Sequence, residues 1–237
     1  MLVAAAVCPC PPLLVPEVAA GAAPELDTLR DACAEALDVL AAARPDLLIV
    51  VGPADLSGRG PHPEGATGSF RGFGVDLGVR LGRDRGTAVD RPLPPSLAIG
   101  AWLLAGAHWA QTPVEALGVG EPLETARCTD TGRKLSTRAE RVALLVMGDG
   151  SACRTVKAPG YLDARAESFD AAAARALGAA DPDALTALDA SLAYELKAAG
   201  RAPWQVLAGA AEGADLDGRL LYEDAPYGVG YLVAAWS

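Results

Sequence analysis

Sulfur-bearing and acidic side chains stand directly after three short apolar runs of the 237-residue sequence. Thiolates and carboxylates are metal ligands, and carboxylates also act as bases. We therefore select a set of candidates by role: Asp149 and Cys153 for catalysis, Asp55 and Ser151 for substrate binding, and Cys10 as a metal ligand. The ordinary alternative is that Asp and Ser cap the turn after a strand, while free Cys is among the most buried residue types.

The cysteines differ in what their positions predict. Cys8 and Cys10 would face the same side of a strand about 6–7 Å apart, so two thiolates could reach one metal. Cys-x-Cys alone is a weak zinc pattern, because zinc ribbons use wider spacing and a second pair. Packing in the core is the better interpretation for Cys8, and also for Cys33 on the apolar stripe of a helix. The odd total of five favours a reducing cytoplasm over a disulfide framework.

Only two histidines occur, so a histidine-rich metal site is excluded by number. His62 lies between two prolines in a long polar segment, where it either enters the site as a substrate-binding residue or is solvated. Tyr227, in the Gly-flanked turn 225–228, is a further substrate-binding candidate. The sequence contains no G-x-S-x-G elbow, no phosphate loop with Lys and no dinucleotide glycine fingerprint.

Hydrophobic periodicity predicts the strands and helices that carry these residues. Apolar runs predict buried strands over residues 2–8, 47–51 and 142–147, and a spacing of three to four predicts an amphipathic helix over 25–43. Strand, helix, strand is a βαβ unit with parallel strands. The pattern also predicts other elements: strands over 75–81, 220–222 and 229–236, helices over 95–108, 161–180, 182–188, 191–199 and 203–211, and a long loop over 54–74.

We therefore predict one α/β domain over residues 1–237, with a central, mostly parallel or mixed sheet flanked by helices. Ligands of open α/β sheets bind beyond the carboxyl ends of the strands, where the candidates stand. From this placement we predict that Cys10 and Cys153 line one shared cleft there, with the 54–74 loop either completing or plugging it.

Composition limits the class of protein. Hydrophobic residues make up 51% and charged residues 21%, as in a globular chain, and the net charge is −10. An acidic chain without a basic face argues against nucleic-acid or anionic-membrane partners. The expected occupant of the strand-end cleft is a small-molecule ligand or a partner peptide. The apolar start lacks a positive n-region and no stretch reaches membrane-spanning length, so we expect a soluble, cytoplasmic protein.

A family resemblance rests on several of these segments. Residues 7–17, VCPCPPLLVPE, resemble the opening of class III extradiol ring-cleavage dioxygenase subunit-B-like proteins, including the Memo-like branch, in which a strand precedes His-Pro-Pro. Residues 148–153, GDGSAC, resemble the Gly-Asp-x-Ser-His segment of that family. Similar likenesses cover 47–53, 161–189, 203–210 and 225–231, and the chain is most similar to an alanine-rich actinobacterial branch.

The resemblance implies a non-haem Fe(II) held by two His and one carboxylate, together with a homodimer. This sequence departs from that pattern: Cys10 stands where the first His is expected, residues 52–54 lack the second, and 200–204 contain no carboxylate. Cys153 stands near the position of the family's acid/base His. A thiolate would favour zinc or copper over iron.

We therefore predict a non-standard or absent metal site and no competent catechol ring cleavage. Three hypotheses stay open: a metal-dependent oxidoreductase or hydrolase with a Cys/His site, a metal-free enzyme using Cys153 or Asp149, and a binding protein whose metal site has decayed.

Overall fold

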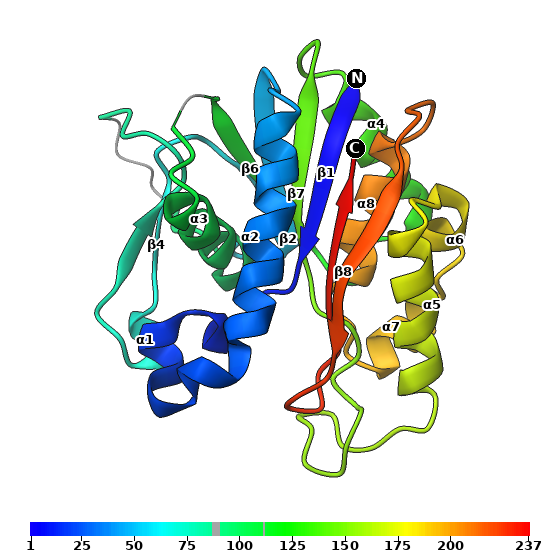
Figure 1. The fold of residues 1–237 in the computed structure, drawn as a ribbon. Coiled ribbons are helices and arrows are strands. Elements are labelled where there is room, and N and C mark those ends of the chain that lie inside the picture. Colours follow the sequence, from blue (N-terminus) through cyan, green and yellow to red (C-terminus); the bar gives the residue numbers. More distant parts are fainter. Residues whose placement is uncertain (87–90, 111) are drawn as a thin grey trace.

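The computed structural model describes residues 1–86, 91–110 and 112–237. Its centre is a seven-stranded sheet in the order β3-β6-β2-β7-β1-β9-β8 (Figure 1). The four parallel strands are β1 (Leu2–Cys8), β2 (Leu47–Pro53), β6 (Val114–Val119) and β7 (Val142–Met147). The antiparallel strands are β3 (Gly60–His62) at one side and β9 (Tyr231–Trp236) and β8 (Gly218–Asp224) at the other.

Helices cover both faces of the sheet, which is why the central strands are continuous apolar runs. On one face, alternate strand residues such as Ala6 and Val50 pack against α2 (Asp27–Ala42) and α3 (Pro95–Gly106). On the other face, residues such as Val7 and Ile49 pack against four helices: α4 (Thr125–Ser136), α5 (Ala166–Gly178), α6 (Pro182–Thr186) and α8 (Arg201–Ala210).

Smaller elements surround the ends of the sheet. The chain leaves β1 through η1 (Pro12–Leu14), α1 (Pro16–Ala19) and η2 (Ala20–Leu26). A two-stranded hairpin of β4 (Thr67–Ser69) and β5 (Gly78–Arg80) carries η3 (Arg71–Phe73) at its tip, and α7 (Ala190–Glu195) precedes α8. In the described ranges no helix is both long and apolar enough to cross a membrane.

The predicted α/β class with a central mixed sheet is confirmed. The prediction of a 54–74 loop was wrong, since this segment contains β3, β4 and η3, and the predicted 75–81 strand is a short hairpin partner outside the main sheet. The helix expected from residue 161 begins at Ala166, because Tyr161 has a left-handed backbone (φ 62°) that no helix accepts.

Residues 109–141, for which hydrophobic periodicity predicted no element, contain β6 and α4. In β6 the buried Val114 and Ala116 alternate with the partly buried Glu115 and Leu117, and so short an alternation is easily passed over. In α4 the mean hydropathy is low, because one narrow stripe faces the core and the rest is polar. Their omission hid a fourth strand end at the edge where the candidates stand.

Candidate functional site

The four parallel strands end at one edge of the sheet, and their following loops bring polar residues to it. Cys10 follows β1, Asp55 follows β2, Glu121 follows β6 and Asp149 follows β7. Because this is the edge at which open α/β sheets bind ligands, we describe it as the carboxyl edge. Glu121 was not a candidate from the sequence, because β6 was not predicted and the strand end before Glu121 was therefore not recognised.

Asp149 is the polar centre of the carboxyl edge. Its Oδ1 accepts the backbone N–H of Cys10 at 2.7 Å, and its own carbonyl accepts the N–H of Gly200 at 2.8 Å. Burial raises the pKa of Asp149 to about 6, against the lowering effect of the Cys10 N–H. A carboxyl group with such a pKa exists in both protonation states near neutrality, as an acid–base group must. In the described residues nothing hydrogen-bonds to its Oδ2.

Cys10 lies beside this carboxylate and is 9% exposed. Burial, then the charges of Asp149 and Glu121, raise the pKa of its thiol well above the ordinary value. Only the thiolate is a good metal ligand or nucleophile. The surroundings of Cys10 therefore disfavour both of these roles at neutral pH.

Tyr231 completes the group and was not a candidate from the sequence. β9 runs antiparallel to β1 with Val7 opposite Ala234, so the first residue of β9 lies level with Cys10. Tyr231 is 2% exposed, and its pKa is raised by burial and then by Asp149 more than by any other charged neighbour. The signal that could have found it is the antiparallel closing strand, whose amino end must lie at the carboxyl edge.

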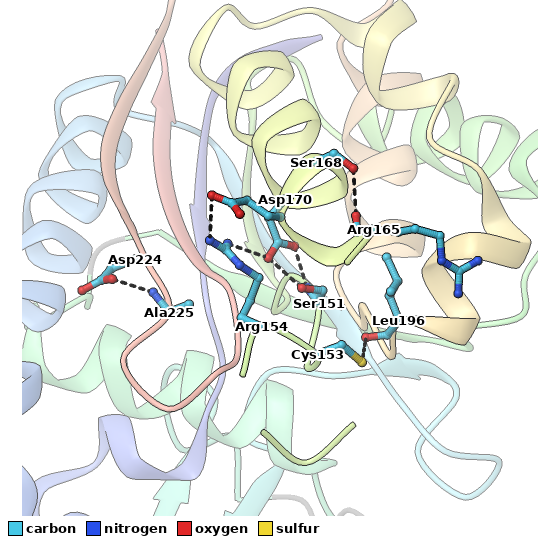
Figure 2. Close-up of polar contacts among 10 residues, drawn as sticks. Ser151, Cys153, Arg154, Arg165, Ser168, Asp170, Leu196, Asp224 and Ala225 are labelled. Carbon is cyan, nitrogen blue, oxygen red and sulfur yellow. Dashed lines mark hydrogen bonds and ion pairs between the residues drawn. The ribbon is translucent and has the colours of Figure 1, made fainter. Parts of the chain in front are cut away.

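The segment that carries Asp149 is held in place by a buried carboxylate on α5 (Figure 2). Asp170 accepts both the N–H and the hydroxyl of Ser151 at 2.7 Å, and Arg154 at 3.2 Å. Burial raises its pKa, and these donors act against that rise. Ser151, predicted to bind substrate, is fully buried and already bonded, so its place in the fold is structural. An Asp on the apolar, alanine-rich face of α5 was the available signal.

Cys153 packs in a different hydrophobic cluster from Cys10. Its Sγ donates to the carbonyl of Leu196 at 3.4 Å (Figure 2), and burial raises its pKa. It belongs to the hydrophobic cluster under α5 and α8, whereas Cys10 belongs to the cluster under α2 and α3. The two thiols therefore pack in different apolar clusters, and their predicted place in one shared cleft stays a prediction.

The remaining candidates, Asp55, His62 and Tyr227, are each hydrogen-bonded to other residues of the protein. Asp55 is exposed and caps its own turn, where hydrogen bonds from Ser57 and Gly58 lower its pKa. His62 is 1% exposed, its Nε2 lies 2.8 Å from the Gly58 carbonyl, and burial lowers its pKa. Tyr227 donates its hydroxyl to Glu25 at 2.9 Å and so ties the β8–β9 turn to η2.

Arg201, at the start of α8, is a buried cation on the far side of the loop that follows β6. It donates to the carbonyl of Leu123 at 2.6 Å, to the side chain of Gln205 at 3.0 Å and to the carbonyl of Glu121. These contacts fasten the β6–α4 loop to α8. They also occupy the guanidinium, which forms no ion pair with Asp149 in the described part of the chain.

The iron site implied by the family resemblance does not fit these residues. Within residues 1–86, 91–110 and 112–237, no three His, Cys, Asp or Glu side chains lie close enough together to hold a metal ion. A facial triad needs two imidazoles and a carboxylate on one ion. Here Asp149 is the carboxylate that is hydrogen-bonded to Cys10, and His62 is engaged with Gly58 on β3's side of the sheet.

The fold is similar to that of an uncharacterized protein, JW3007, from Escherichia coli K12. The match covers 99% of both chains, with a TM-score of 0.57 and 15% sequence identity, so the likeness concerns the fold alone. No protein-family profile and no curated protein matches the sequence.

Proposed function

We propose that this chain is an extradiol dioxygenase subunit-B-like protein that has lost the iron triad and binds a small molecule at the carboxyl edge. The observation that carries the proposal is Asp149, a partly buried carboxyl group with one oxygen on the Cys10 N–H. It stands where ligands of open α/β sheets bind. The absence of a three-ligand group around it in the described residues argues against catechol ring cleavage.

Asp149 is also suited to proton transfer. Its pKa of about 6 lets it take a proton from a bound molecule, or return one, near neutral pH. Cys10 supplies the hydrogen bond that holds the carboxylate in place. The catalytic role predicted for Asp149 thus stays part of the proposal, whereas Cys153 makes no contact that supports one.

The first experiment measures metal content in untagged protein purified without chelators, for wild-type and Cys10→Ala. We expect no near-stoichiometric metal in either, and no oxygen uptake with catechol after Fe(II) is added. Stoichiometric iron, zinc or copper that disappears in Cys10→Ala would contradict the proposal. It would favour a metal-dependent oxidoreductase or hydrolase instead.

The second experiment screens small molecules of every charge type by amide NMR. We expect at least one class to shift the resonances of Cys10 and Gly150 in wild-type protein and not in Asp149→Asn. If no compound of any charge perturbs these amides, binding at the carboxyl edge is refuted.

Two further parts of the proposal concern the setting of the protein. All five cysteines are buried, free thiols, which supports a reducing cytoplasmic location. The family resemblance implies a homodimer, and light scattering of purified protein should give about 48 kDa rather than the 24.1 kDa of one chain.

A further inference from the structure

Two carboxylates of the described chain, Glu64 and Asp170, are less exposed than Asp149, and both are paired with arginines. Glu64 accepts Arg83 at 3.2 Å and also pairs with Arg85. Asp170 pairs with Arg154 at 3.2 Å. This is the usual arrangement, because an ionised carboxylate taken out of water needs a compensating charge.

Asp149 departs from that arrangement. Among the described residues no Lys, Arg or His forms an ion pair with it, and the one hydrogen bond to its carboxylate comes from a neutral backbone group. The nearest other charge at Cys10 is Glu121, which is also acidic. Asp149 therefore has negative charge nearby and no ion-pair partner among the described residues, while the guanidinium of Arg59 lies further along the edge, against Gly120.

Tyr231 supplies an independent indication that a ligand belongs there. Its ring is almost fully buried between the end of β1 and the loop after β7, since Gly230 exchanges hydrogen bonds with Gly150 and Ser151. Its hydroxyl makes no hydrogen bond to the described residues, yet it is not one of the fully enclosed polar atoms. The hydroxyl oxygen is thus accessible to solvent and has a free acceptor.

We propose that the ligand of the Asp149 site is a small organic cation, an alkylammonium group that takes the place of the missing arginine. The ammonium would form an ion pair with the free Oδ2 of Asp149 and donate to the Tyr231 hydroxyl. An aromatic ring beside a carboxylate is a common recognition element for ammonium groups. This inference rests on the proposed function, because it names the ligand class of the same site.

Other ligand charges fit less well. An anion would meet Asp149 and Glu121 without an arginine paired to Asp149, since Arg154 and Arg201 are engaged elsewhere and Arg59 donates to the carbonyl of Ala54. A bare metal cation would find no third ligand among the described residues. An organic ammonium needs only one carboxylate and a hydrogen-bond acceptor.

The test titrates methylammonium chloride into the protein at low ionic strength and follows the amide resonances of Cys10, Gly150 and Tyr231. Methanol, sodium acetate and sodium chloride serve as neutral, anionic and salt controls. We expect methylammonium to bind and the controls to leave these resonances unchanged. Asp149→Asn should weaken methylammonium binding at least about tenfold, because a paired charge is lost. Its amide oxygen still accepts the Cys10 N–H, so the fold is kept.

Two matched variants sharpen the result. Asp181→Asn removes one negative charge from the cap of α6, where Asn caps equally well, and should bind methylammonium as wild-type does. Tyr231→Phe keeps the ring and removes the acceptor, so methylammonium should bind about threefold more weakly or worse.

Binding of methanol or acetate in an Asp149-dependent manner, without methylammonium binding, would overturn the inference and leave the proposed function standing. If no compound in the NMR screen shifts the amide resonances of the site, both the ammonium inference and the proposed function are refuted. Equal methylammonium affinity in wild-type and Asp149→Asn would also overturn the inference.

Discussion

Identical side chains at the carboxyl edge have different pKa values because their surroundings differ. Asp149 and Asp55 are both aspartates just beyond parallel strands, yet burial raises the pKa of Asp149 to about 6 whereas hydrogen bonds lower that of Asp55. A group that binds its proton more tightly than in the unfolded chain is stabilising when protonated. The two residues therefore contribute to stability with opposite dependence on pH.

For Asp149, the contribution to the free energy of unfolding falls as pH rises from about 4, where the unfolded chain ionises, to about 6. Asp149→Asn keeps the acceptor for Cys10 and cannot ionise. We expect this variant to be more stable than wild-type by about 1–2 kcal/mol at pH 7.5, since the site is partly open to solvent and one pKa unit corresponds to about 1.4 kcal/mol. Urea unfolding at pH 4.5 and 7.5 measures the difference.

Asp55→Asn is the control for this prediction. Its carboxylate is favoured by its hydrogen bonds, so this substitution should give no gain at pH 7.5. An Asp149→Asn protein that is less stable than wild-type at pH 7.5 would contradict the burial argument.

The packing of α4 against α8 depends on how closely their two backbones approach. α4 and α8 cross at two glycines: a Cβ on Gly132 would meet the carbonyl oxygen of Val206, and one on Gly209 would meet the carbonyl oxygen of Thr129. Both obstacles are backbone atoms, which cannot turn aside as a side chain can. This contact fixes α8 beneath the carboxyl edge and, through Arg201, the loop that bears Glu121.

We expect Gly132→Ala and Gly209→Ala each to lower the free energy of unfolding by about 1–3 kcal/mol or more, because the two helices must separate. Gly106→Ala, at the end of α3, meets no atom within 4 Å and should be neutral or slightly stabilising. Urea unfolding of the three variants compares the same substitution in crowded and open positions. Equal effects at all three positions would show that the helices do not cross as closely as described.

The whole molecule is a covered sheet with an apolar layer packed on each face. The two hydrophobic clusters lie on opposite faces of the sheet. The described residues form no three-ligand group that could link folding to an ion.

At this scale we expect dialysis against EDTA to leave the melting temperature unchanged, and added zinc or iron not to raise it, since only an ion bound by the folded state stabilises it. Differential scanning calorimetry before and after dialysis checks this. A melting temperature that falls on chelation and recovers with one metal would contradict it.

Much of this architecture follows from the sequence alone. Leucine- and valine-rich runs such as 142–147 can be buried on both faces only in a covered parallel sheet, and the stripe of 25–43 requires a helix on it. That logic places Cys10, Asp55 and Asp149 at strand ends and identifies the carboxyl edge. It depends only on periodicity, which is local along the chain.

Tertiary structure decided which of those residues meet. Cys10 and Cys153 pack in different hydrophobic clusters, and the antiparallel return of β9 brings Tyr231 level with Cys10. Asp170, far along the chain, fixes Ser151. These contacts join residues separated by many positions, and the burial that sets the pKa of Asp149 exists only when all layers are packed. No local pattern in the sequence encodes them.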